Sequence, residues 1–123
     1  MKVFYYEIIA FQMENRGLKT PHIVVLVTTA NREEAEKILN NLLETGLVAC
    51  GNILSNVASV FRWAGKIEKA EECLLLLKSR RDLFGRIAEA VKKLQSYEVP
   101  EIIAFEIADG SEAYLNWLEK SLK

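Results

Sequence analysis

A phenol and two carboxylates lie together in the stretch Tyr97-Glu98-Val99-Pro100-Glu101. Because Val99 precedes a proline, its backbone favours an extended conformation and cannot prolong the helical pattern before it. Pro100 has no backbone N–H, so it suits the first residue of a strand. A rigid strand would hold this junction in place, and its oxygens could then bind a cation or transfer a proton. The competing interpretation is a solvated loop.

Two more candidates for a binding site flank a predicted hairpin. Trp63 is either a stacking platform for a ligand or an anchor at an interface, because tryptophan is enriched in both settings. Lys78 closes a run of leucines, and the alternative to a binding role is a packed stem with its ammonium group in solvent.

The cysteines and the single histidine are the remaining candidates for metal ligands. Cys50 would be a soft ligand for Cu(I) or Zn(II), and the alternative is a small buried residue. Cys73 lies among leucines and is predicted to be core. His22 belongs to no cluster and is predicted to lie on the surface. The simple hairpin register does not place the cysteines opposite each other, so no disulfide is expected.

A strand and an amphipathic helix begin the regular part of the chain. Residues His22–Thr29 form a nearly continuous β-branched run, which is typical of a strand covered on at least one face. Asn31 is the predicted N-cap of the helix, with Glu34 placed as in a capping box. The helix is predicted to end at Gly46, and its apolar positions are Ala35, Ile38, Leu39, Leu42 and Leu43.

Two long strands and a tight turn come next. Residues 47–63 are rich in β-branched side chains, and Gly51-Asn52 and Ser55-Asn56 predict bulges or bends. Ala64-Gly65 is a two-residue hairpin link, and residues 66–78 return as the second strand. That strand would span about 40 Å at ~3.3 Å per residue, roughly twice an ordinary strand. The tip must overhang the sheet although it is apolar and aromatic, so a homo-oligomer is predicted.

A second helix, a strand and a short helix complete the chain. Ser79 is predicted to cap the second helix, and residues 99–107 form the last core strand. Asp109-Gly110-Ser111 then turns into a helix whose predicted apolar face is Tyr114, Trp117, Leu118 and Leu122. The order β-α-β-β-α-β plus a terminal helix predicts an α+β, ferredoxin-like fold, with an antiparallel sheet and helices on one face.

Composition limits the domain count and the partners. The chain has 123 residues, is 50% hydrophobic and carries a net charge of −1, which predicts one domain over residues 21–123. Residues 1–20 are predicted to be an N-terminal extension, with a strand at 3–11 and a turn at 14–17. No basic cluster is interleaved with aromatic residues and no apolar run has membrane length, so neither nucleic acid nor a membrane is an expected partner. Two cysteines fit a reducing cytoplasm.

Five motifs in this order resemble the CutA (CutA1) divalent-cation tolerance proteins: Leu47-Val48-Ala49-Cys50, Phe61-Arg62-Trp63-Ala64-Gly65-Lys66, Leu77-Lys78-Ser79, Tyr97-Glu98-Val99-Pro100-Glu101-Ile102 and Tyr114-Leu115-Asn116-Trp117-Leu118. The resemblance runs from about His22 to the C-terminus. It implies a homotrimeric ferredoxin-like protein, cytoplasmic in bacteria and linked to tolerance of copper and other divalent metals, with signalling or binding rather than enzymatic activity. It also implies that Trp63, Lys78 and Tyr97 lie near one inter-subunit cleft, and Glu98 is the fourth candidate ligand-binding residue.

The sequence departs from the family pattern immediately before the tyrosine. Many family members carry His-Pro there, whereas this chain has Leu94-Gln95-Ser96. The missing imidazole is a good borderline metal ligand, so any copper or zinc is expected to bind more weakly than in members that keep the histidine. The candidate metal ligands are Cys50, Glu98 and Glu101, and no cofactor is expected to be obligatory.

Three functions remain open at this point. The first is a non-enzymatic trimer that binds a metal ion or a small effector in its clefts and passes that state to a partner protein. The second is an enzyme in which Tyr97 or Glu98 serves as acid or base. The third is a structural or signalling assembly without a metal site.

Overall fold

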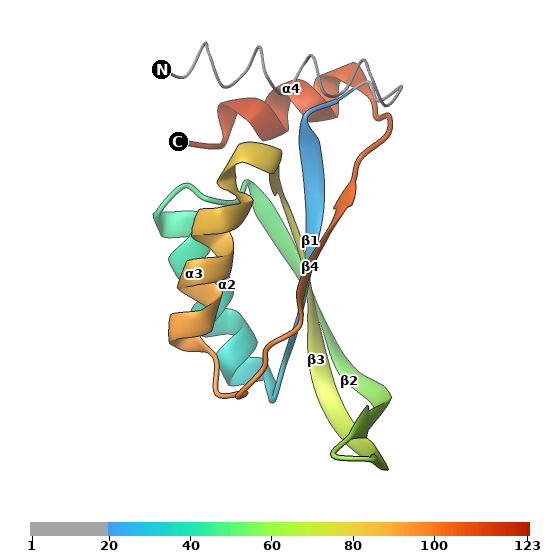
Figure 1. Ribbon diagram of the computed structural model, residues 1–123. Coiled ribbons are helices and arrows are strands. Elements are labelled where there is room, and N and C mark those ends of the chain that lie inside the picture. Colours follow the sequence, from blue (N-terminus) through green and yellow to red (C-terminus); the bar gives the residue numbers. More distant parts are fainter. Residues whose placement is uncertain (1–19) are drawn as a thin grey trace.

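The computed structural model describes residues 20–123, which form one antiparallel sheet with two helices on one of its faces (Figure 1). The strands are β1 (His22–Thr29), β2 (Cys50–Trp63), β3 (Lys66–Arg80) and β4 (Ile102–Glu106). The helices are α2 (Arg32–Glu44), α3 (Phe84–Leu94) and α4 (Glu112–Lys120). The strand order across the sheet is β2-β3-β1-β4. The α+β, ferredoxin-like prediction is confirmed. The predicted strand at 3–11 and turn at 14–17 lie outside the described residues.

The ends of α2 follow the sequence signals. Asn31 caps the helix, because its Oδ1 accepts a hydrogen bond from the Glu34 backbone N–H at 2.8 Å. Only this half of the predicted capping box forms, since the Glu34 carboxylate instead accepts from the backbone N–H of Ser96 at 3.4 Å. Gly46 follows the helix with a φ of 72°, a conformation that glycine adopts without strain.

The prediction that Ser79 caps the second helix is wrong. Ser79 is buried within β3, and its Oγ donates a hydrogen bond to the Leu47 carbonyl at 2.6 Å. β3 continues to Arg80 because its whole inner half pairs with β1, up to the pair His22–Arg80. A 3-10 turn, Arg81–Leu83, then leads into α3. β4 is likewise shorter than the predicted 99–107, since only residues 102–106 pair with β1.

Strands β2 and β3 form a ribbon that extends beyond the sheet, as predicted (Figure 1). The ribbon turns at Ala64-Gly65, where both residues have positive φ and Trp63 pairs with Lys66. A bulge falls between Leu54 and Val57, with Asn56 at a φ of 60°. The predicted irregularity at Gly51-Asn52 is absent, because both residues pair regularly with β3. The ribbon tip is exposed.

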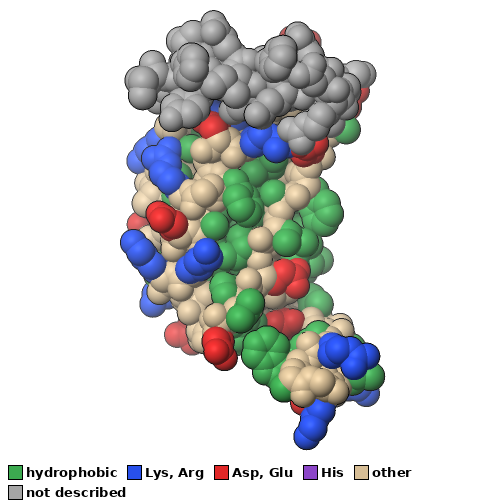
Figure 2. All heavy atoms as spheres, viewed as in Figure 1, with side chains coloured by type: hydrophobic (Ala, Val, Ile, Leu, Met, Phe, Trp, Pro, Cys, Tyr) green, Lys and Arg blue, Asp and Glu red, His purple; other side chains and the backbone are tan. Residues whose placement is uncertain are grey.

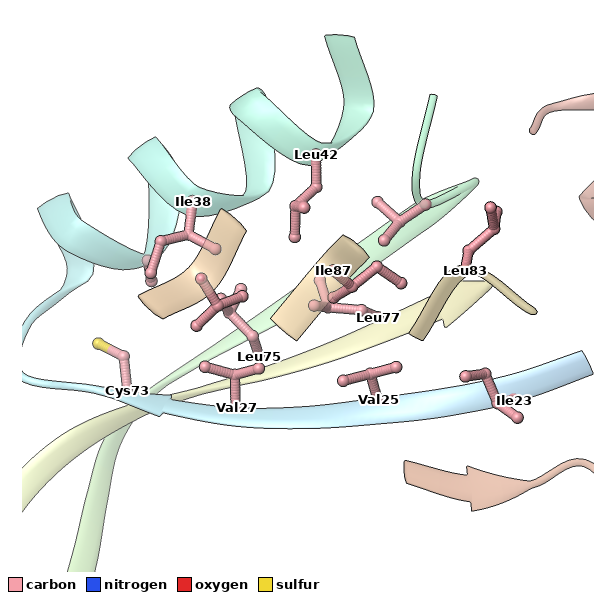
Figure 3. Packing of buried hydrophobic residues seen from close by; sticks show 13 residues of the cluster. Ile23, Val25, Val27, Ile38, Leu42, Cys73, Leu75, Leu77, Leu83 and Ile87 are labelled. Carbon is pink, nitrogen blue, oxygen red and sulfur yellow. The ribbon is translucent and has the colours of Figure 1, made fainter. Parts of the chain in front are cut away.

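The core lies between the sheet and helices α2 and α3 (Figure 3). Alternate residues of the central strands point into it, and Leu75 and Leu77 of β3 and Val25 and Val27 of β1 are fully buried. Ile38 and Leu42 of α2 and Ile87 and Val91 of α3 close the core from the helical side.

Of the helices within residues 20–123, α4 lies over one end of the opposite face of the sheet (Figure 1). There Glu119 reaches His22 and Arg80, and Tyr114 reaches Cys50. Beyond this contact the face is mainly apolar, with Asn52 and Thr28 as polar members, and its most exposed apolar side chains are Leu54 (43%), Ile103 (46%) and Phe105 (55%). Val24, Leu26, Leu74 and Leu76 fill the space between them and are partly buried. We refer to these seven apolar residues as the open face.

Candidate functional site

A pocket of about 680 Å³ lies where the β2–β3 ribbon leaves the body of the domain. Its walls come from three places: the ribbon, the end of β1 at Thr28, and the link between α3 and β4. The pocket brings together Trp63, Tyr97, Glu98 and Glu101. Four residues predicted from the sequence to bind a ligand or a metal therefore share one cavity, although they belong to segments more than thirty positions apart.

The phenol of Tyr97 joins this link to the base of the ribbon. Its hydroxyl donates a hydrogen bond to Oε2 of Glu72 at 2.7 Å. Burial and this bond to a carboxylate raise the pKa of the Tyr97 phenol above its ordinary value. Tyr97 therefore stays protonated near neutral pH, where it acts as a hydrogen-bond donor.

An aromatic wall faces the same cavity from the ribbon. Phe61 and Trp63 are 42% and 49% exposed, and both line the pocket. The turn register places Phe61 opposite Glu68 and Trp63 opposite Lys66, so these side chains share one side of the ribbon with Glu72. Figure 2 shows hydrophobic side chains running down the body to the base of the ribbon, with Lys and Arg side chains at the ribbon tip.

Acidic side chains dominate the charge of the pocket. Four carboxylates line it, from Glu68, Glu72, Glu98 and Glu101, against the single ammonium group of Lys69. Glu68, Glu98 and Glu101 are exposed at the rim, whereas Glu72 is only 8% exposed. The cavity therefore combines an apolar wall with a negative rim and a buried negative group.

Lys78 and Cys50 do not line this pocket. They form a cross-strand pair near the other end of β3, six residues from Glu72, or about 20 Å at ~3.3 Å per residue. The Lys78 ammonium group hydrogen-bonds to Oδ1 of Asn52. The half-buried Cys50 Sγ lies 3.5 Å from the Tyr114 hydroxyl, and this hydrogen bond raises the pKa of Tyr114 to about 12.

The candidate metal ligands do not form one site within a chain. Glu98 and Glu101 line the ribbon pocket, while Cys50 faces Tyr114 near α4. Among residues 20–123, no three His, Cys, Asp or Glu side chains are grouped so that they could hold a metal ion. The residues that one chain places together therefore do not fit a metal centre.

The prediction that His22 lies on the surface is wrong. The side chain is buried, and its Nε2 lies 3.0 Å from Oε1 of Glu119. Glu119 also contacts Arg80, which pairs in turn with Asp82. This network attaches α4 to the ends of β1 and β3, so it is structural. Cys73 is buried in the core as predicted, and both cysteines are free.

Glu72 is a buried pocket residue that sequence reasoning missed, and Thr28, Glu68 and Lys69 also line the pocket without having been candidates. Counting back from the two-residue turn at Ala64-Gly65 places Glu72 on the side of the ribbon that carries Trp63, so the register contained part of the signal. Its burial and its bond to Tyr97 depend on how the α3–β4 link packs against the ribbon. That packing is a tertiary contact with no local sequence pattern.

The family of the chain follows from comparison with known proteins. The family model described as "CutA1 divalent ion tolerance protein" matches residues 23–121. The chain belongs to the CutA1 divalent ion tolerance family. The resemblance noted in the sequence is thus confirmed, and all five motifs lie within the matched range.

Relatives of this CutA1 chain come from distant organisms. The chloroplastic protein CutA of Arabidopsis thaliana is 40% identical over 114 residues, which are 93% of this chain and 63% of the relative. The chain therefore spans less than two thirds of that plant protein. The solved structure of Cut A1 from Thermus thermophilus is 40% identical with a TM-score of 0.81, over 83% of this chain and 99% of that one. The structure of CutA from Archaeoglobus fulgidus is 37% identical with a TM-score of 0.80, over 83% and 99%.

The location of this CutA1 chain stays a prediction. Within residues 20–123, no helix is long and apolar enough to cross a membrane. The names of the relatives point to different compartments, since the Arabidopsis protein is called chloroplastic and the A. fulgidus protein periplasmic. The expected cytoplasmic location is not tested by these names.

Proposed function

We propose that this CutA1 protein is a non-enzymatic, cytoplasmic homotrimer that supports divalent-cation tolerance by holding a metal ion or a small effector in the ribbon pocket at a subunit boundary. The observation that carries the proposal is the pocket itself, in which Trp63 and Tyr97 meet carboxylates from two distant segments. A cavity of this size with a few polar groups on an apolar wall is typical of small-molecule sites. The tolerance role rests on the family to which the chain belongs.

The open face supports assembly. Seven apolar side chains lie together on this side of the sheet, and within residues 20–123 α4 occupies one end of it. Apolar surface of this extent usually contacts another protein chain. Thr28 and Glu72 belong to the same side of the sheet and also line the pocket. A second copy on the open face would thus border the pocket.

The state of Tyr97 favours binding over catalysis. A phenol with a raised pKa is a poor general base near neutral pH. Its proton is already engaged by Glu72, which suits a fixed donor in a binding site. The enzyme alternative would need Glu98, at the exposed rim, to act without an adjacent nucleophile from this pocket.

A metal ion would enter this site in one of two ways. It would be chelated by a small molecule that the pocket holds, or it would gain further donors from an adjacent subunit. Glu98 and Glu101 supply two carboxylates in either case. A signalling partner protein would then bind the trimer in its ligand-bound state.

Glu98→Gln is expected to weaken ligand binding while leaving the trimer stable, because Glu98 is exposed and removing its charge affects only the pocket rim. The measurement is the shift in melting temperature when ZnCl₂, CuCl₂ or the copper(II)–glycine chelate is added separately. The shift reports binding because stabilisation grows with the ratio of free ligand concentration to Kd. Tyr97→Phe should reduce the same shift. It should also cost about 1–2 kcal/mol of stability, because the buried Glu72 loses its hydrogen-bond donor.

Glu89→Gln is the matched control, since Glu89 is exposed on α3 and away from the pocket. It should respond to each ligand as the wild type does. Equal shifts in wild type, Glu98→Gln and Trp63→Ala would place any bound ligand outside the ribbon pocket and contradict the proposal.

A further inference from the structure

Glu72 is a largely buried carboxylate for which residues 20–123 supply no ion-pair partner. Its side chain lies at the base of the ribbon and is 8% exposed. Oε2 accepts a hydrogen bond from the neutral phenol of Tyr97 at 2.7 Å, whereas Oε1 keeps some contact with solvent and has no hydrogen-bond partner among residues 20–123. Burying a carboxylate without a cation costs several kcal/mol as a general rule. Glu72 is only partly withdrawn from water, but a carboxylate in such a position favours a positive partner.

The place of Glu72 in the fold points to the pocket as the site where that partner binds. Glu72 is one of the residues that line the cavity. Three exposed carboxylates, from Glu68, Glu98 and Glu101, surround the same opening, and Lys69 is the single basic residue of the lining. Carboxylates at a cleft with apolar walls raise the local concentration of positive ligands.

The aromatic wall adds a second preference for positive charge. Phe61, Trp63 and Tyr97 all line the cavity. The faces of such rings attract an ammonium or guanidinium group that carries little tightly bound water. A bare divalent ion needs several close oxygen, nitrogen or sulfur ligands instead, and residues 20–123 offer no such group of three.

We propose that the ribbon pocket selects an organic cation, an ammonium or guanidinium group on a compact apolar body, whose charge pairs with Oε1 of Glu72 while its body lies against Phe61 and Trp63. This proposal rests on the proposed function, because it names the ligand class of the same pocket. A metal chelate would be accepted in so far as it is positively charged and carries an apolar ligand. An anionic effector would be rejected by the four carboxylates.

Three small probes of similar size and shape, but different charge, test whether the pocket selects a positive charge. They are 2-phenylethylammonium, its neutral analogue 2-phenylethanol, and the anion phenylacetate. Isothermal titration calorimetry on the full chain is expected to give binding of the ammonium compound about tenfold or more tighter than that of the alcohol, because a charge-assisted hydrogen bond is lost in the alcohol. Phenylacetate should give no heat of binding.

Glu72→Gln tests the named residue. Glutamine keeps the size of the side chain and a carbonyl that can accept from Tyr97, so the fold should survive. We expect about tenfold or greater loss of affinity for 2-phenylethylammonium and little change for 2-phenylethanol. Glu98→Gln, at the exposed rim, should cause a smaller loss of the same sign, and Glu89→Gln should cause none. The Glu98 variant keeps the test valid if Glu72→Gln is poorly folded.

The outcomes distinguish this inference from the proposed function. If phenylacetate binds as tightly as the ammonium compound and Trp63→Ala abolishes both, the pocket is a ligand site but its selectivity for cations is wrong. If Zn²⁺ alone binds and Glu72→Gln abolishes it, the occupant is a bare ion and the inference is overturned. If Glu72→Gln leaves binding intact but changes the molecular mass in solution, the pocket holds a neighbouring copy and the inference also fails. Absence of heat with all three probes overturns it as well.

Discussion

Phe105→Asp is expected to convert the proposed homotrimer to monomers at micromolar concentration. Phe105 is 55% exposed on the open face, beside Ile103 and opposite Val24. A carboxylate there would have to enter an apolar interface without a partner, whereas the isolated domain would keep it in solvent. Removing a central aromatic anchor of an interface often weakens association by about 2 kcal/mol or more even without the new charge. Light scattering measures the change in mass.

Leu43→Asp is the matched control for this substitution. Leu43 lies on α2, in the helical layer away from the open face, and is 40% exposed. The same chemical change should therefore leave the trimer mass unchanged. If both variants remain trimeric, the open face is not the assembly surface.

Leu75→Ala should lower the free energy of unfolding by about 2–5 kcal/mol, the range found for deleting a fully buried leucine side chain. Leu75 is completely buried in the centre of the sheet, between Val27 of β1 and Ile53 of β2. The helices above it cannot collapse into the space without disturbing their own packing against the sheet (Figure 3). Because a domain is stable by only about 5–15 kcal/mol, this loss is large.

Denaturant unfolding at one fixed protein concentration measures this loss, since the proposed assembly would also contribute to stability. Leu43→Ala, which removes the same atoms from an exposed position, should cost about 0.5 kcal/mol or less. A loss below about 1 kcal/mol for Leu75→Ala would contradict the description of Leu75 as a tightly packed residue at the centre of the core.

Local sequence patterns predicted the elements well because each depended on chemistry within a few residues. The β-branched run of β1 predicted its bounds, His22–Thr29, and Ala64-Gly65 predicted the turn and the pair Trp63–Lys66. Positive φ values at Ala64 and Gly65 are what a two-residue hairpin requires. Ser55-Asn56 likewise predicted the bulge from local chemistry, and Asn56 has a positive φ there.

Prediction failed where an element's end depends on pairing with a distant strand. Ser79 has the side chain of a helix cap, but the ladder from β3 to β1 continues past it to Arg80. The buried state of His22 likewise depends on Glu119, which is 97 residues away and reaches it only once α4 has docked. Neither contact has a local signature.

The candidate site was predicted in part. Tyr97, Glu98 and Glu101 share a short link, and Trp63 was a candidate from its residue type that the family resemblance placed near Tyr97. The structure places all four at one cavity. Lys78 lies at the other end of β3 within the same chain. Only the folded chain revealed Glu72, because its importance comes from burial rather than from residue type.

The central claim, that the ribbon pocket lies at the boundary between subunits of a homotrimer, is tested most directly by the molecular mass of the wild-type protein in solution. Multi-angle light scattering at micromolar concentration is predicted to give three times the chain mass of 14.0 kDa. A single species of 14.0 kDa across that concentration range would contradict the claim.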